Sequence, residues 1–152
     1  MKKIAILFIS LAIVIFIVLI ILNNKNHPFY LDDIYYNNSS IIDVNIDEFK
    51  QLINNKASFA LFIYQPLFST SYNFDEVLTT FSIDYQISFY QMSFSDMKKT
   101  ELKEYIKYCP SLVIYHNGKI IDYLDANNSK HSKYYKSVTG LEEWFFNYVL
   151  LK

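Results

Sequence analysis

The chain has 152 residues, enough for one domain with a modest core and a short appendage. It contains no arginine. Without Lys2, Lys3 and Lys25, eleven of its 14 lysines stand against 15 acidic residues, a net charge of −4. This balance argues against a nucleic-acid partner. With two glycines there is no glycine-rich phosphate loop, and with one cysteine, Cys109, no intrachain disulfide can form.

An apolar segment over residues 4–22 comes first in the chain, with no charged residue and one polar residue, Ser10. Such a helix of ~19 residues spans roughly 28 Å, about the thickness of a hydrocarbon core. Lys2 and Lys3 precede it, which predicts an N-terminus in the cytoplasm and the remainder outside. The alternative is a cleaved signal peptide, but the length of the run and the lack of a small-residue cleavage site argue against it. We expect a transmembrane signal anchor over residues 1–22, with membrane contact through residues 4–22.

The next two regions are a linker and the start of a folded domain. Residues 23–40 are polar with interspersed aromatic residues, which predicts a juxtamembrane tether with little regular structure. Residues 41–152 form the expected domain. Its first elements are a short strand over residues 41–44 and a helix capped by Asn45 or Asp47, whose apolar positions are Phe49, Leu52 and Ile53.

A continuous apolar run over residues 59–64 predicts a central strand covered on both faces. After a loop over residues 65–67, Ser69 or Ser71 is expected to cap a helix bearing Tyr72, Phe74, Val77, Leu78 and Phe81. Partial alternation over residues 87–94 predicts the next strand. Ser95 or Asp96 is then expected to cap a helix that presents Met97, Leu102, Tyr105 and Ile106.

The strongest local pattern lies over residues 108–124. Two apolar runs flank Asn117-Gly118, a pair that accepts the positive φ angles of a type I′ turn, so the pattern predicts a β-hairpin. Pro110 cannot donate a ladder hydrogen bond and should stand at the start of the first strand. A polar loop over residues 125–140, with one helical turn near residues 133–136, and a helix over residues 141–151 complete the order β-α-β-α-β-α-β-β-α.

Helix, Xaa-Pro, strand, Asn-Gly turn, strand and terminal helix together resemble the C-terminal half of the thioredoxin fold, in which the proline is cis and faces the active site. The segment 62–74 resembles the active-site segment of thioredoxin-like proteins, including bacterial bacteriocin transport accessory proteins. There Pro66 matches the loop proline and Phe74 the aromatic that follows a Cys-x-x-Cys pair. The resemblance covers about residues 41–151. It implies an α/β class and a three-layer α/β/α sandwich with a mixed sheet. From this resemblance together with the lysines before the apolar segment, we expect a single-pass protein of a bacterial cytoplasmic membrane with this domain outside.

In this alignment the two cysteine positions are Phe68 and Ser71, so the dithiol chemistry of the family is missing. The family's first cysteine is a thiolate at a helix N-terminus, and Phe68 cannot replace it. We therefore expect a module that binds a protein or peptide without disulfide turnover. The expected contact residues are Phe68, Ser69, Ser71, Cys109 and Pro110. The resemblance further implies that the backbone before the cis proline pairs with an extended partner segment.

Three alternatives remain open at this stage. Cys109 alone could act as a reactive thiol, although a free cysteine also packs as a small hydrophobic residue. Phe68 could be an exposed contact residue or could fill the space that the family's disulfide occupies. The resemblance to bacteriocin accessory proteins also suggests a role beside peptide export. No cofactor is expected. No metal is expected either, because His27, His116 and His131 lack metal-ligand spacing.

Overall fold

The computed structural model describes residues 27–67 and 69–152, and the apolar segment 4–22 and Phe68 lie outside these ranges. Within this part of the chain no helix is both long enough and apolar enough to cross a bilayer. The transmembrane prediction therefore falls on residues outside the described ranges.

A five-stranded mixed sheet forms the centre of the domain, in the order β1-β3-β2-β4-β5. The strands are β1 (Ile41–Asp43), β2 (Phe59–Tyr64), β3 (Phe89–Ser93), β4 (Ser111–His116) and β5 (Lys119–Tyr123). β1, β3 and β2 run parallel, whereas β4 is antiparallel to both β2 and β5. This confirms the expected mixed sheet, with the apolar run of β2 between two neighbouring strands.

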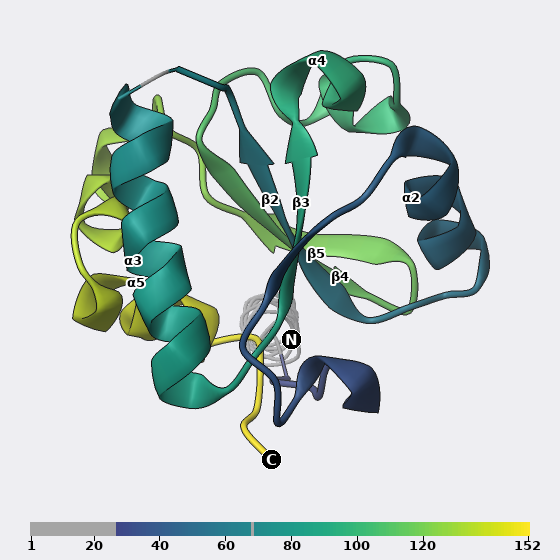
Figure 1. Cartoon of the computed structure of the whole chain (residues 1–152), viewed down its shortest axis with the longest axis horizontal. Helices are drawn as coiled ribbons and strands as arrows, with labels where there is room; N and C mark the ends of the chain where they lie inside the picture. Colours follow the sequence, from purple (N-terminus) through teal and green to yellow (C-terminus); the bar gives the residue numbers. More distant parts are fainter. Residues whose placement is uncertain (1–26, 68) are drawn as a thin grey trace, which may run out of the picture.

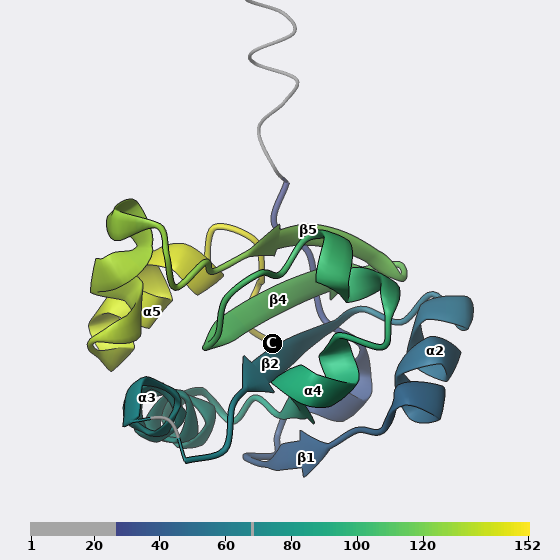
Figure 2. The same cartoon turned by 90° about the horizontal axis from the view of Figure 1, so that it is seen from above.

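Helices cover both faces of the sheet (Figure 1). α3 (Ser69–Tyr85) and α5 (Val138–Phe145) lie on one side, and α2 (Ile46–Asn54) and α4 (Phe94–Met97) lie on the other, as the view in Figure 2 also shows. The core between the sheet and the α3–α5 layer is aromatic: Phe81 of α3 contacts Phe89 of β3 and Phe145 of α5. The three-layer α/β/α prediction is confirmed.

Two local signals form as the sequence predicts. Asn45 caps α2 through its side chain, which accepts from the backbone N–H of Glu48, while the Glu48 carboxylate accepts from the backbone N–H of Asn45. In the hairpin, Asn117 and Gly118 both have positive φ angles, 52° and 73°, as a type I′ turn requires. β4 pairs with β5 so that His116 lies opposite Lys119, and the register of the two strands shifts at a bulge between Ile114 and Tyr115.

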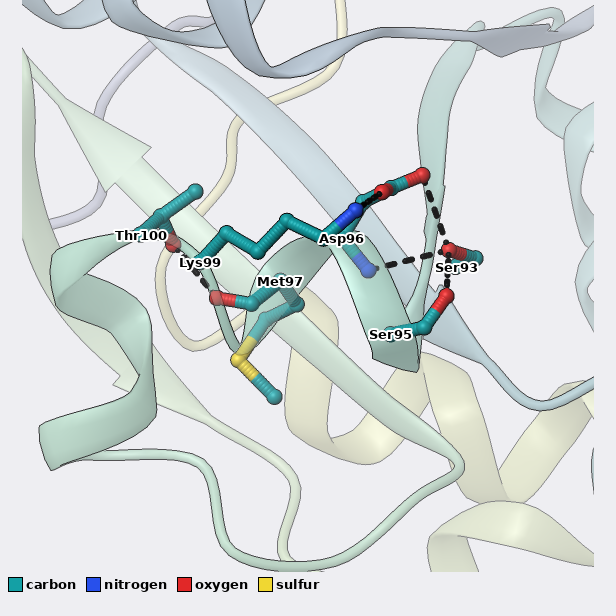
Figure 3. Close-up of polar contacts among 6 residues, drawn as sticks. All are labelled: Ser93, Ser95, Asp96, Met97, Lys99 and Thr100. Carbon is teal, nitrogen blue, oxygen red and sulfur yellow. Dashed lines mark hydrogen bonds and ion pairs between the residues drawn. The ribbon is translucent and has the colours of Figure 1, made fainter.

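The helix expected after β3 is wrong in its cap and its length. Ser93, and not Ser95 or Asp96, caps α4, because its Oγ accepts from the backbone N–H of Asp96 at 3.1 Å. α4 ends after one turn, where Thr100 Oγ1 donates to the Met97 carbonyl at 2.8 Å (Figure 3). Thr100 then caps a separate 3₁₀ helix, η2 (Glu101–Glu104). Of the four apolar positions predicted, only Tyr105 is exposed. The other three are buried: Met97 in α4, Leu102 in η2 and Ile106 just after η2.

The segment before β1 packs on the domain. It contains one 3₁₀ turn, η1 (Asp33–Tyr35), and its Leu31, Tyr35 and Tyr36 are buried. The sequence assigned residues 23–40 to a tether, and the described part of it, residues 27–40, also supplies part of the core. Phe29 forms a parallel bridge with Val149, so this segment pairs with the end of the chain.

The C-terminal elements differ from prediction in their bounds. α5 begins at Val138, capped by Ser137, and ends at Phe145, whereas the pattern predicted residues 141–151. The preceding loop holds a longer 3₁₀ helix than the single turn expected, η3 (Ser129–Tyr135). Residues that follow α5 instead pair with Phe29, because its carbonyl accepts from the backbone N–H of Leu150 at 2.8 Å.

Candidate functional site

The turn before β4 carries the Cys109-Pro110 peptide, which is cis, as the resemblance predicted. Tyr135 of η3 reaches across to this turn, and its hydroxyl donates to the Pro110 carbonyl at 3.0 Å. Phe74 of α3 packs edge-on against the Tyr135 ring, with 4.8 Å between centroids. Burial raises the pKa of the Tyr135 hydroxyl, so this group stays a hydrogen-bond donor to Pro110.

The loop between β2 and α3 lies beside this turn. Leu67 has a left-handed backbone (φ 64°) and its side chain is fully exposed. Ser71 is buried, and its Oγ accepts from the backbone N–H of Gln65 at 3.2 Å. Ser69 is the first residue of α3, so neither serine precedes the helix and the expected capping role is wrong. Phe68 lies outside the described residues, and the choice between a contact residue and a filled space stays a prediction.

Gln65 joins the two halves of the site. Its backbone donates to Ser71, and its side-chain Oε1 lies 3.4 Å from Cys109 Sγ, which donates to it. Ser71 and Cys109 are thus both hydrogen-bonded to Gln65, one to its backbone and one to its side chain. Gln65 and Tyr135 were not among the predicted site residues. Tyr135 is 25 positions from Pro110 in a polar loop, and no sequence pattern signals a contact at that separation.

The Cys109 thiol is poorly suited to attack. Burial raises its pKa above the ordinary value, and the attraction of the Lys98 ammonium offsets only part of this effect. The backbone N–H and C=O of Cys109 have no hydrogen-bond partner among the residues that the structure describes. Cys109 therefore offers a free backbone edge and a thiol held in its protonated form.

Two clefts lie in this region, and Pro110 lines the first of them. One, of about 720 Å³, lies between α3 and η3 and is lined by Thr70, Val77, Pro110 and Tyr135, among others. The other, of about 560 Å³, is lined by the 65–67 loop together with Ser69 and Ser71 of α3. Two carboxylates, Asp43 and Asp75, line the second cleft, and none of its lining residues is cationic. Burial, and then repulsion by Glu76, raises the pKa of Asp75.

The histidines are spread over the domain. His116 Nδ1 lies 3.1 Å from Ser58 Oγ, and His131 Nδ1 accepts from the backbone N–H of Asp125 at 3.0 Å. Within the described ranges, no group of three or more His, Cys, Asp or Glu side chains is arranged to hold a metal ion. The roles of these two histidines in the structure are local hydrogen bonds.

The sheet order, the two helical layers and the cis proline define a thioredoxin-fold protein, and solved structures agree. The thioredoxin pre-protein of Schistosoma mansoni superposes with a TM-score of 0.55 at 14% identity, covering 73% of this chain and 100% of that chain. Plasmodium falciparum thioredoxin superposes with a TM-score of 0.52 at 18% identity, covering 70% of this chain and 98% of that chain. Thioredoxin O1 of Arabidopsis thaliana superposes with a TM-score of 0.51 at 13% identity, covering 70% of this chain and 97% of that chain. At these identities the likeness concerns the fold. Comparison with protein-family models and with curated protein sequences finds no match.

We expect Cys109 in the folded chain to react slowly with iodoacetamide at neutral pH, because a raised pKa leaves little thiolate. Unfolding in urea should speed the reaction, since it removes the burial that raises the pKa. In the folded chain the rate should keep rising with pH beyond the point at which an ordinary thiol has levelled off. Mass spectrometry of the alkylated chain over time measures both rates. A folded chain that reacts as fast as the unfolded one at neutral pH would contradict this expectation.

Proposed function

We propose that this chain is a membrane-anchored, extracytoplasmic thioredoxin-like protein that binds an extended protein or peptide segment without exchanging disulfides. The observation that carries the proposal is the free backbone edge at Cys109, beside Pro110, which lines the cleft between α3 and η3. An extended segment can add its own backbone hydrogen bonds to such an edge and place alternate side chains on either side. Phe68, Ser69 and Ser71 are the further contacts in this proposal.

The proposed lack of dithiol–disulfide turnover follows from the number of cysteines in the chain. Disulfide exchange by a dithiol needs two cysteines, and Cys109 is the only one in the sequence. The competing function is a monothiol reaction at Cys109 itself. Its raised pKa and its hydrogen bond to Gln65 both favour the protonated thiol, which is not the nucleophilic form. These features support binding over catalysis. A role beside peptide export is part of the same proposal and rests on the resemblance of residues 62–74.

A photocrosslinking experiment tests the binding surface. A benzophenone amino acid replaces Leu67, which is fully exposed at the site, or Ile83, which is 59% exposed near the other end of α3. We expect discrete adducts in native membranes from position 67 and none from position 83. Peptides selected from a random library on the full chain in nanodiscs should compete with the adducts from position 67. Equal labelling from both positions, or no competition by any selected peptide, would contradict the proposal.

An insulin-reduction assay on the full chain separates the two functions. We expect no turnover above the rate of the dithiothreitol control. Turnover that disappears in Cys109→Ser would establish the monothiol reaction and overturn the redox-inactive part of the proposal. Crosslinking from position 67 would still report binding in that case, because the two measurements depend on different groups.

A further inference from the structure

A second surface lies at the end of the domain opposite the candidate site. Segment 27–36 meets the start of β2, where the Asp32 backbone N–H donates to the Ser58 carbonyl at 2.9 Å and Asp32 Oδ2 accepts from the Ser58 N–H. The site lies at the other end of β2, after Tyr64. Six strand residues separate the two ends by roughly 20 Å. Figure 1 shows η1 and the C-terminal segment at the lower end of the domain and the start of α3 at the upper end.

This lower surface exposes large apolar side chains from two segments of the chain. Ile34 is 70% exposed and Tyr30 is 50% exposed, and Leu151 and Leu150 from the end of the chain are 45% and 37% exposed. We call these four residues the lower apolar patch. They are held together by backbone pairing of Phe29 with residues 148 and 150, and by the Tyr36 hydroxyl, which donates to the Leu150 carbonyl at 2.7 Å.

One lysine and two aspartates, Asp32 and Asp33, lie at this surface. Lys152 forms an ion pair with Asp33, and its ammonium also lies 5.6 Å from the centre of the Tyr30 ring. An exposed tyrosine, aliphatic side chains and a lysine in one place are the combination found where a protein meets the headgroup layer of a bilayer, with the aromatic ring at the level of the headgroups.

The length of chain between the apolar segment and the domain determines what can cover this surface. Residues 23–26 are all that separate residue 22 from His27, and a fully extended linker of that length reaches about 18 Å at most. A domain tethered so closely, with its first residues running across the lower end, must keep that end near the bilayer. A single exposed apolar residue would need no explanation, but four large apolar side chains on the tethered end do.

We infer that the lower apolar patch rests on the lipid headgroup layer and orients the domain so that the Cys109-Pro110 edge faces away from the membrane. The inference rests on the membrane anchoring in the proposed function. With this orientation the binding edge stands roughly 20 Å from the lipid surface, which leaves room for an extended partner segment. The lipid contact is made by Tyr30, Ile34, Leu150 and Leu151, and none of these residues belongs to the candidate site.

Fluorescence quenching by labelled lipids tests the orientation. The full chain, as Cys109→Ser, receives an environment-sensitive NBD dye at Ile34→Cys, at Leu151→Cys or, as the control at the far end, at Leu67→Cys. Each variant is reconstituted in vesicles of phosphatidylethanolamine and phosphatidylglycerol, with or without a lipid that carries a nitroxide near its headgroup. We expect about half of the fluorescence at positions 34 and 151 to be quenched, and almost none at position 67. Because Ile34 and Leu151 are exposed, neither change removes a core contact.

The other outcomes each overturn the inference. If the chain floats with the vesicles but no position is quenched, anchoring stands and the lipid contact does not exist. Equal quenching at all three positions would mean that the domain has no fixed orientation. A blue shift at position 34 that depends on protein density and not on the nitroxide would mean that a second copy covers the patch. If the chain does not float with the vesicles, the anchoring itself fails.

Discussion

Replacing Phe81 by alanine should lower the free energy of unfolding by about 3–5 kcal/mol, the usual cost of emptying a buried aromatic site. Phe81 is fully buried in α3, and its ring lies 5.1 Å from that of Phe145 and 4.7 Å from that of Tyr85. Its neighbours belong to α3, α5 and β3, so they cannot close together to fill the space without moving whole elements. Urea unfolding, followed by the fluorescence of Trp144, the single tryptophan, measures the loss.

The matched control for this change is Ile83→Ala. Ile83 lies two positions further along the same helix and is 59% exposed, so the change should alter stability by no more than about 0.5 kcal/mol. The pair separates the loss of packing from any general effect of alanine in α3. A loss of less than about 1 kcal/mol for Phe81→Ala would show that the aromatic layer between α3 and the sheet is not packed as described.

Gly118→Ala should cost roughly 2–4 kcal/mol, the second large effect. Gly118 has a φ of 73°, where a side chain is disfavoured, and an added Cβ would lie 2.6 Å from the Ile53 carbonyl oxygen at the end of α2. The Gly118 backbone N–H also donates to the Ala57 carbonyl at 2.9 Å, so the hairpin cannot move away without losing this bond. The same urea experiment measures the change.

Asn117→Gly is the control at the neighbouring position. Asn117 also has a positive φ, 52°, but glycine adopts that conformation freely and removes only an exposed contact with the His116 ring. We expect a change within about 0.5 kcal/mol. If both variants were equally stable, the hairpin tip would not be packed against α2, and the close approach at Ile53 would be wrong.

Local patterns predicted the elements that local chemistry determines. Asn45 with Glu48, and Asn117 with Gly118, each form the cap or turn that their residue types favour, because all the groups involved lie within a few positions. The helix after β3 shows the limit of periodicity. Met97, Leu102 and Ile106 are buried as their spacing suggested, but the spacing reports burial and does not report that Thr100 interrupts the backbone hydrogen bonds between them.

The proximity of the candidate site residues was predictable only as far as the family pattern reached. Ser71 and Cys109 are each hydrogen-bonded to Gln65, which agrees with the proximity that the alignment with thioredoxin-like proteins implied. The residues that hold them, Gln65 and Tyr135, act through contacts 44 and 25 positions away, and such contacts have no periodicity to detect. The buried aromatic residues of segment 27–36 were missed for the same reason, since their neighbours lie near Ser58 and Leu150.

The pairing of Phe29 with the end of the chain also determines where a pulling force on the N-terminal segment would first act on the domain. If residues 4–22 hold the chain in the membrane, any tension between the membrane and a bound partner enters the domain through residues 23–28. The first bonds under load are those of Phe29, whose N–H donates to the Tyr148 carbonyl and whose carbonyl accepts from Leu150, each at 2.8 Å. Yielding there would release only residues 29 and 30, about 7 Å of extended chain. The Asp32–Ser58 hydrogen bonds and the buried Leu31, Tyr35 and Tyr36 would still hold the rest of the segment to the domain. The sheet and the Cys109-Pro110 edge would keep their shape while this slack is drawn out.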